Sequence, residues 1–191
     1  MGELVKMRER ESQKEGLRRL LRTIHEKTGK TLTGIEAGSY AGESAQLMAE
    51  TGLVDRLFCV DPWKGGWDSK DVASSTDLSE AEAEFDRRMA LNPRVVRKFK
   101  GTLQEFRAKF PDLKPDFVYI DAEHTYEGCR RDIETALEWR PLAVSGHDYC
   151  RGWSGVMKAV DEKFGRPYAV FEDESWLVFP DYDSLQVLGN L

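Results

Sequence analysis

Short apolar runs alternate with amphipathic segments along most of the chain, and this alternation limits the fold more than any other feature. Five apolar runs each lead through a polar or glycine-rich turn into a segment with helical spacing; they are residues 32–37, 57–60, 95–99, 117–120 and 142–144. Repeated strand–helix units predict an α/β fold, with a mostly parallel sheet and helices on both faces. The last two apolar runs, 168–171 and 176–179, are separated only by residues 172–175, so they can pair only as antiparallel neighbours.

The N-terminal part of the chain has a different pattern. Residues 1–16 are mostly charged with both signs mixed, which is typical of a solvated surface and leaves a frayed helix or a loose arm open. From Leu17 to Ile24, aliphatic residues recur at intervals of three and four, the spacing of one buried helix face, and Gly29 ends the pattern. This helix is also a candidate contact in a homodimer.

Two pairs of residues predict capped helices. Ser79 with Glu82, and Thr102 with Glu105, have the spacing of a capping box, in which a hydroxyl and a carboxylate satisfy the first amides of a helix. The polar segment 62–78 before the first pair is long for a connection in an α/β domain. Segments of this kind are often lids over an active site, so we expect it to help select the substrate.

The overall charge and the cysteines exclude several classes of protein. A net charge of −6 and a pI near 5.3 argue against a general nucleic-acid binder, which usually has a basic face. Three cysteines without metal-type spacing are typical of a reduced cytoplasmic protein. No apolar run approaches the roughly 18 residues of a membrane span, and the N-terminus lacks the apolar core of a signal peptide. We therefore expect a cytoplasmic protein with no nucleic-acid or membrane partner.

The segment 36–42, after the first expected strand, has the composition of a ligand-binding turn. Gly38 allows a sharp turn and a close approach of ligand to backbone, and a helix starting near Gly42 directs its amides at that ligand. This Gly-x-x-x-Gly spacing is a weak motif, and a tight turn without a ligand is the alternative. Asp61 supports a ligand, because it lies 23 residues after Gly38 (61 − 38), where a carboxylate binds ribose hydroxyls. A helix cap or a surface acid is its alternative role.

Three features favour S-adenosylmethionine over a dinucleotide as this ligand. The turn lacks the Gly-x-Gly-x-x-Gly fingerprint for pyrophosphate. Glu36 precedes the turn, where its charge would repel a pyrophosphate but suit an ammonium and a sulfonium. The antiparallel pair at the C-terminal end is also foreign to dinucleotide-binding folds.

Four segments together resemble class I S-adenosylmethionine-dependent methyltransferases, and in particular the small-molecule O-methyltransferases that include the macrolide sugar methyltransferases. The segments are residues 36–44, 59–63, 119–126 and 146–149, and the resemblance covers roughly residues 30–180. It implies a Rossmann-like three-layer sandwich with a seven-stranded sheet of order 3-2-1-4-5-7-6 and strand 7 antiparallel. It also divides the chain into an N-terminal helical arm, residues 1–30, and a methyltransferase domain, residues 31–191.

The same resemblance implies where S-adenosylmethionine binds. Gly38 would lie against its methionine portion and Glu36 near its ammonium, while Asp61 would bind the ribose and Thr102 would border the adenine. The full set of expected cofactor-binding residues is Glu36, Gly38, Ser39, Tyr40, Gly42, Asp61, Pro62, Trp63, Thr102 and Asp121.

Asp121 and Asp148 each follow a central strand, so we expect them on one rim although they are 27 residues apart (148 − 121). Two carboxylates with open positions suit Mg²⁺ or Mn²⁺. Metal-dependent members of the resembled group have an acid at the position of Asp121 and two adjacent ligands at 147–148. The first of these is His147 here, so the expected metal set is Asp121, Asp148 and His147. His147 as a general base, or acids that only cap helices without a metal, are the alternatives.

His124 and His147 both flank this rim, and with Asp121 they are the candidate catalytic residues; we assign no role to His25. Several aromatic residues also fall near the expected mouth of the site, where they would either stack on an acceptor or simply pack. They are Trp63, Trp67, Tyr126, Tyr149 and Trp153.

The sequence therefore predicts an S-adenosylmethionine-dependent methyltransferase that O-methylates a small hydroxylated molecule, assisted by a divalent metal. A nucleotide-dependent oxidoreductase on a doubly wound sheet and a non-catalytic binder on a methyltransferase-like scaffold are the alternatives. A sugar, a phenol, a lipid-linked glycan and a protein side chain all stay open as acceptors.

Overall fold

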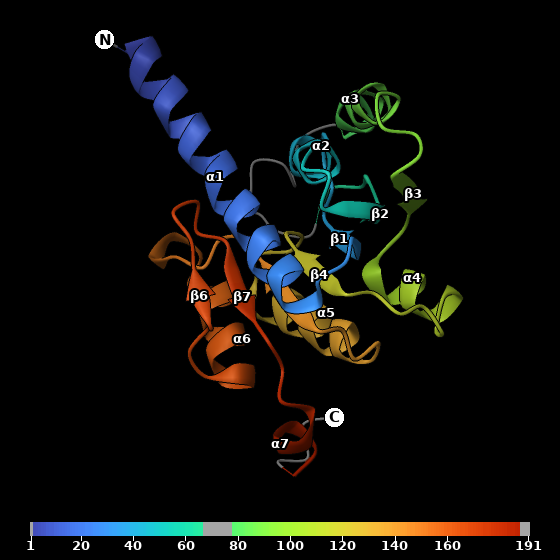
Figure 1. The fold of residues 1–191 in the computed structure, drawn as a ribbon, viewed down its shortest axis with the longest axis vertical. Helices are drawn as coiled ribbons and strands as arrows, with labels where there is room; N and C mark the ends of the chain where they lie inside the picture. Colours follow the sequence, from blue (N-terminus) through green and yellow to red (C-terminus); the bar gives the residue numbers. More distant parts are fainter. Residues whose placement is uncertain (1, 67–77, 188–191) are drawn as a thin grey trace.

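The computed structural model describes residues 2–66 and 78–187, and Figure 1 shows its helices around one central sheet. The sheet order is β3-β2-β1-β4-β5-β7-β6, as the sequence predicts, with β7 antiparallel to both of its neighbours. The strands are β1 (Leu32–Ala37), β2 (Val54–Asp61), β3 (Val96–Lys100), β4 (Phe117–Ile120), β5 (Ala143–Gly146), β6 (Ala169–Val170) and β7 (Trp176–Val178).

Helices cover both faces of the sheet and make a three-layer fold. They are α1 (Gly2–Thr28), α2 (Glu43–Glu50), α3 (Ser79–Met89), α4 (Leu103–Lys109), α5 (Tyr126–Leu137), α6 (Ser154–Phe164) and α7 (Tyr182–Val187), with a 3₁₀ turn, η2 (Arg151–Trp153). Strand β4 shows how the two faces divide, because alternate side chains of a strand point to opposite faces. Phe117 and Tyr119 join the core under α1, α2 and α3, whereas Val118 and Ile120 join the core under α4, α5 and α6.

Helix α1 is continuous from Gly2, so of the two forms left open for the N-terminal segment the structure has a helix over residues 2–16. Figure 1 shows the N-terminal half of α1 projecting beyond the rest of the molecule. The predicted buried face of its C-terminal half is confirmed from Leu17 to Ile24, and Arg19 pairs with Glu172 in the turn between β6 and β7. The C-terminal half of α1 therefore belongs to the core.

One of the two predicted capping boxes is confirmed and the other is wrong. Thr102 Oγ1 accepts from the Glu105 amide at 3.2 Å, and Glu105 Oε2 accepts from the Thr102 amide at 2.8 Å. Helix α3 begins at Ser79 itself, with Leu78 at the N-cap and no side-chain hydrogen bond there. Glu82 instead pairs with lysines of the adjacent β3, which is a stronger attraction than a cap amide offers.

All three cysteines are free, and no helix in the described ranges is long and apolar enough to cross a membrane. Residues 67–77 of the expected lid lie outside the described residues.

Candidate functional site

The carboxyl ends of β1, β2, β3, β4 and β5 meet at one edge of the sheet, beside a cavity of about 990 Å³. This is where ligands bind in open α/β sheets. Most of the residues expected from the sequence line it: Gly38, Ser39, Tyr40, Gly42, Asp61, Pro62, Thr102, Asp121, His124 and His147. Glu36, Trp63 and Asp148 are not among its lining residues.

Gly38 joins the ends of β1 and β4. It has a φ of 87°, and a Cβ there would lie 1.9 Å from the carbonyl oxygen of Asp121 and 2.7 Å from the Cα of Ala122. No side chain fits this approach of two backbones, so glycine is required even without a ligand. The same approach brings the glycine turn and Asp121 to one side of the cavity.

Glu36 lies beneath the turn and is fully buried. Its two carboxylate oxygens accept hydrogen bonds from Ser39 Oγ at 2.6 Å and Ser44 Oγ at 2.5 Å. Burial raises the pKa of Glu36 to about 7; the two hydroxyls act against this rise, and the charge of Asp121 adds to it. Glu36 therefore fixes the turn from inside the protein.

Asp61 links the glycine turn, residues 36–42, to the end of β2 through hydrogen bonds. Its carboxylate accepts from the backbone amides of Tyr40 at 2.9 Å and Trp63 at 2.6 Å, and burial raises its pKa. The Trp63 indole donates to the Tyr40 carbonyl at 2.8 Å, and its ring packs against Phe85 with centroids 5.0 Å apart. Asp61 is neither a helix cap nor a surface acid, and Trp63 has a packing role in the structure.

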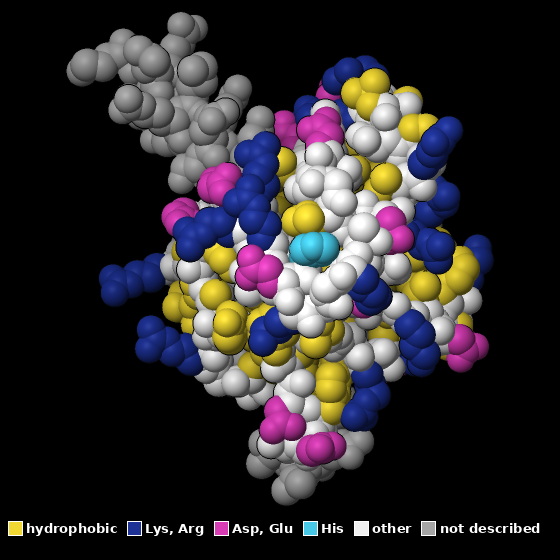
Figure 2. All heavy atoms as spheres, viewed as in Figure 1, with side chains coloured by type: hydrophobic (Ala, Val, Ile, Leu, Met, Phe, Trp, Pro, Cys, Tyr) yellow, Lys and Arg dark blue, Asp and Glu magenta, His cyan; other side chains and the backbone are white. Residues whose placement is uncertain are grey.

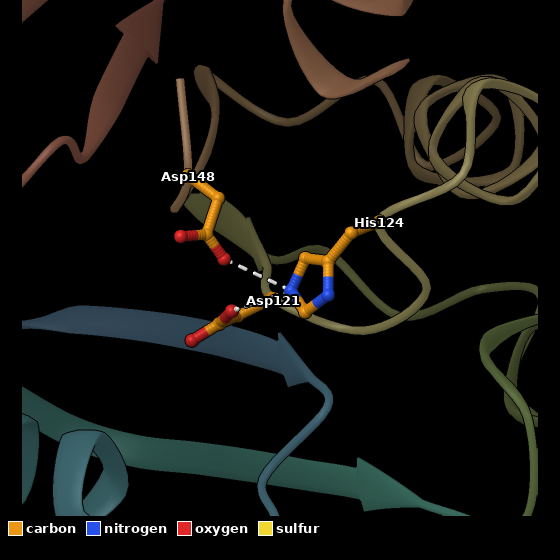
Figure 3. A group of neighbouring side chains, drawn as sticks. All are labelled: Asp121, His124 and Asp148. Carbon is orange, nitrogen blue, oxygen red and sulfur yellow. Dashed lines mark ion pairs between the residues drawn. The ribbon is translucent and has the colours of Figure 1, made fainter. Parts of the chain in front are cut away.

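Figure 3 shows the second group of charged side chains, which comes from the loops after β4 and β5. His124 Nε2 lies 2.9 Å from Asp148 Oδ2 and 3.6 Å from Asp121 Oδ1. One ligand atom from each of these three residues lies within 4.8 Å of the other two. Asp148 has a φ of 62°, a left-handed conformation that aspartate and asparagine tolerate better than most residues.

The charged side chains of this group strongly shift one another's pKa values. Burial alone would lower the pKa of His124, but the carboxylates of Asp121 and Asp148 outweigh it and raise the pKa to about 10. His147 behaves in the same way, mainly because of Asp148, and its pKa rises to about 9. Burial alone would raise the pKa of Asp148, but hydrogen bonds from the two histidines hold it well below its usual value. Two acids and two cationic histidines thus compensate one another at the rim of the cavity.

Asp121 and Asp148 meet at one rim, as the sequence leads one to expect, but the histidine within the cluster is His124. His147 lies to the side, with Nδ1 3.3 Å from the other carboxylate oxygen of Asp148. Two carboxylate oxygens and one imidazole nitrogen form a donor set that fits a divalent cation. The positions of Asp121, His124 and Asp148 therefore suit a metal better than the set that includes His147.

The aromatic residues expected at the mouth pack within the protein where they are described. Trp153 lies against the His124 ring with centroids 4.4 Å apart, while Tyr126 and Tyr149 donate to Glu162 and Asp161 of α6. None of these three lines the cavity. Trp67 lies outside the described residues.

Sequence reasoning missed a polar group at the other end of the cavity. Gln104 and Asp132 line it, and Gln104 Nε2 lies 2.7 Å from Asp132 Oδ1. One signal was available, because Asp132 falls among Cys129, Ile133 and Ala136 in the buried stripe of α5. An acid in an apolar stripe indicates a specific partner.

The comparisons with known proteins agree with the fold. A sequence model described as a methyltransferase domain matches residues 35–147, which is more than half of the chain. No curated protein sequence gives a significant match.

Three solved structures have a similar fold at low sequence identity. Cofactor-bound Rv0187 from MTB has a TM-score of 0.60 at 13% identity, covering 85% of this chain and 78% of its own. An O-methyltransferase from Bacillus cereus in complex with SAH has a TM-score of 0.55 at 18% identity, covering 86% and 78%. CalS11, a TDP-rhamnose 3′-O-methyltransferase of calicheamicin biosynthesis, has a TM-score of 0.55 at 13% identity, covering 84% and 77%.

Sheet order and family together exclude the oxidoreductase alternative. Strand β7 lies antiparallel between β5 and β6, which a doubly wound dinucleotide-binding sheet does not have. The chain belongs to the methyltransferase-domain family and is a class I S-adenosylmethionine-dependent methyltransferase.

Proposed function

We propose that the protein transfers the methyl group of S-adenosylmethionine to a hydroxyl oxygen of a small molecule. The observation that carries this proposal is the cluster of Asp121, His124 and Asp148 beside the glycine turn. Methyl transfer to oxygen requires that a hydroxyl lose its proton while it is held in line with the methyl group and the sulfur. Acids and imidazoles that converge on one point of the cavity rim are the groups such a step uses.

In this proposal Asp121, His124 and Asp148 hold a divalent ion, Mg²⁺ or Mn²⁺. Such an ion lowers the pKa of a hydroxyl that binds to it. The two carboxylates favour a protonated His124 in the ion-free site, so binding of an ion would require His124 to release this proton. Asp148 favours the protonated form of His147 in the ion-free site, and a divalent ion on the two carboxylates would remove that effect. His147, which lines the cavity, is therefore the residue we assign to receive the proton of the acceptor once the ion is bound.

A small acceptor is favoured over a nucleic acid by the charge of the protein. The net charge is −6, and on the face shown in Figure 2 Lys and Arg side chains are scattered in small groups among acidic and apolar ones. Two proteins with the same fold are named as an O-methyltransferase and a TDP-rhamnose 3′-O-methyltransferase, which supports a hydroxyl acceptor. Action in the cytoplasm and a homodimer built on α1 complete the proposal; size-exclusion chromatography with light scattering tests the dimer.

Incubating the protein with methyl-labelled S-adenosylmethionine and a panel of sugars, phenols and hydroxylated natural products tests the reaction. We expect label on oxygen of at least one small acceptor and none on RNA. A strong chelator should abolish the transfer, and Mn²⁺ or Mg²⁺ should restore it. Tight binding of S-adenosylhomocysteine without turnover on any acceptor would favour a non-catalytic binder, and full activity in chelator would remove the metal.

A further inference from the structure

A groove of about 410 Å³ lies at the β3 edge of the sheet, and none of its lining residues also lines the cavity of about 990 Å³. Strands β2 and β3 and helix α4 contribute its residues, and α4 is only seven residues long, so it leaves part of these strands uncovered. The groove combines phenylalanines with cationic side chains: Arg56, Phe58, Arg97, Lys98, Phe99, Phe106 and Phe110. We call it the aromatic groove.

The phenylalanines of the aromatic groove form a cluster that reaches from the core to the surface. The Phe106 ring is buried, and its centroid lies 5.5 Å from that of Phe58, 5.1 Å from that of Phe99 and 4.8 Å from that of Phe110. Phe110 at the outer end is 37% exposed. Aromatic and arginine side chains together are typical of the centre of protein–protein interfaces, where an apolar side chain of the partner packs on them.

Arg97 is held in place beside these rings. Its Nη1 donates to the carbonyl oxygens of Pro93 at 2.9 Å and Val96 at 2.8 Å, which uses both hydrogens of that nitrogen. Nε and Nη2 have no acceptor in the part of the chain that the structure describes. These two nitrogens form a fork that fits both oxygens of a carboxylate. Because the guanidinium is already fixed, little side-chain freedom is lost when a carboxylate binds.

A second guanidinium lies on the same face of the sheet. Arg56 is exposed and precedes Phe58 by two residues in β2, and no carboxylate of the described residues pairs with it or with Arg97. Lys109 Nζ adds positive charge at 5.5 Å from the Phe99 ring centroid and 5.7 Å from that of Phe110. The right-hand side of Figure 2, over β3 and α4 in Figure 1, shows apolar side chains with Lys and Arg side chains around them.

The charges along the β3 edge favour a short acidic segment over a nucleic acid. A phosphate backbone needs a continuous row of available cations. Lys98 and Lys100, farther along β3, both pair with Glu82, and Lys98 also pairs with Asp86. The available positive charge is thus local and borders an apolar surface, which fits carboxylates next to an apolar side chain.

We propose that the aromatic groove docks a partner protein through an acidic segment that carries an apolar side chain. The apolar side chain packs on Phe99 and Phe110, and carboxylates of the segment pair with Arg97 and Arg56. This interaction goes beyond the proposed function and does not rest on it, because the cofactor cavity has no residue in common with the groove.

Selection from a phage-displayed library of short random peptides tests the proposal. The wild-type protein is the target, with excess S-adenosylhomocysteine in its cavity and excess soluble Arg97→Glu variant as competitor for peptides that bind elsewhere. We expect the selected peptides to combine several acidic residues with a leucine or an aromatic residue. Binding of a selected peptide, measured by fluorescence anisotropy, should weaken as the salt concentration rises.

Single substitutions then locate the bound peptide. Arg97→Ala and Phe110→Ser should each weaken peptide binding about tenfold or more, whereas S-adenosylhomocysteine affinity should stay unchanged. Arg94→Ala is the matched control, since Arg94 is exposed in the preceding turn but does not line the groove. Arg56→Ala removes no hydrogen bond within the described residues and serves if Arg97→Ala does not fold. The Arg97→Glu variant should in turn bind a peptide whose acidic residues are replaced by lysine.

Several outcomes would overturn the proposal. They are no enrichment over the competitor, selected peptides without acidic residues, and unchanged peptide affinity in both Arg97→Ala and Arg56→Ala. Tighter binding of an RNA oligonucleotide that is lost in Arg97→Ala would assign the groove to nucleic acid. A wild-type dimer that dissociates in Phe110→Ser, as light scattering would show, would assign it to a second copy of this chain.

Discussion

The carboxylates in the two halves of the cavity rim have different kinds of partner. On the β1–β2 side, Glu36 and Asp61 are buried, and serine hydroxyls and backbone amides satisfy them. On the β4–β5 side, Asp121 and Asp148 face histidines across the opening of the site. Hydrogen bonds satisfy the carboxylates of the first half, and opposite charges compensate those of the second.

This difference agrees with the proposed roles, in which the first half would hold the cofactor and the second would take part in the reaction. A carboxylate that accepts from fixed amides gives a rigid surface for a cofactor whether or not the cofactor is bound. A cluster of like and unlike charges has a protonation state that depends on what enters it, because each charge shifts the pKa of the next. Changes in the first half should therefore alter stability and cofactor binding, and changes in the second should alter turnover.

The largest effect should come from Gly38→Ala, at the junction of the two halves. A Cβ 1.9 Å from the Asp121 carbonyl oxygen forces the β1 and β4 loops apart, and the left-handed φ adds strain. We expect a loss of about 4 kcal/mol in the free energy of unfolding by urea denaturation, because the clash is with backbone. Gly52→Ala, which has a similar φ but open space around its Cβ position, is the control and should cost far less.

Glu36→Gln tests whether the buried Glu36 keeps its own proton in the folded state. Between pH 4.5 and 7 the unfolded state releases the proton of Glu36 while the folded state keeps it, so wild-type stability should fall as the pH rises through this window. A rise from 4.5 to about 7 corresponds to a loss on the order of 3 kcal/mol.

The measurement for Glu36 is the difference in unfolding free energy between wild type and variant at several pH values, in which other titrations cancel. The variant should gain on the wild type as the pH rises. A constant difference would mean that Glu36 is ionised throughout, and the contrast between the two halves would then fail.

Asp148→Asn tests the charged half. Asparagine tolerates the φ of 62° but removes the charge between the two histidines, so methyl transfer should fall about 100-fold or more while S-adenosylhomocysteine affinity changes less than threefold. The kcat and KM for the acceptor, with calorimetry for the cofactor, measure this split. Tyr149→Phe, which loses only a bond to Asp161, is the neighbouring control.

The smallest effect should come from Thr102→Ala. Loss of the hydroxyl that accepts from the Glu105 amide should destabilise the protein by about 1 kcal/mol, the usual value for an N-cap. Thermal unfolding measures it. Loss of enzyme turnover with unchanged stability would show that Thr102 acts in the site and not only as a cap.

Local patterns in the sequence predict the strands well, because burial of an apolar run depends on few other residues. The expected strands 32–37 and 117–120 have the bounds of β1 and β4, and the antiparallel hairpin is confirmed. The spacing of Thr102 and Glu105 is also sufficient to predict the capping box, since both partners lie at the first turn of α4. The same spacing at Ser79 does not produce a capping box, because Glu82 pairs with lysines of β3 instead.

The sequence could not predict which of the two histidines lies in the cluster with Asp121 and Asp148. The answer depends on contacts between residues that are far apart in the chain. The His124 ring lies on Trp153, and the left-handed turn at Asp148 directs that carboxylate towards His124. Neither the stacking nor the backbone turn leaves a periodic signal in the sequence. The buried pair of Gln104 and Asp132 is missed for the same reason, although an acid in an apolar stripe was visible.

The position of β7 between β5 and β6 has a consequence for the order in which the site can form. Gly146 pairs with Trp176, the Trp176 indole donates to the His147 carbonyl at 3.2 Å, and the Tyr149 amide donates to the Glu174 carbonyl at 3.0 Å. The loop that carries Asp148 is thus shaped by residues synthesised well after it, in the final hairpin. The contacts of Gly38 and Asp121 are all made by residues that precede the hairpin, whereas the Asp148 loop makes these contacts only when the hairpin is in place. A chain that ended before this hairpin would therefore lack the contacts that shape the Asp148 loop.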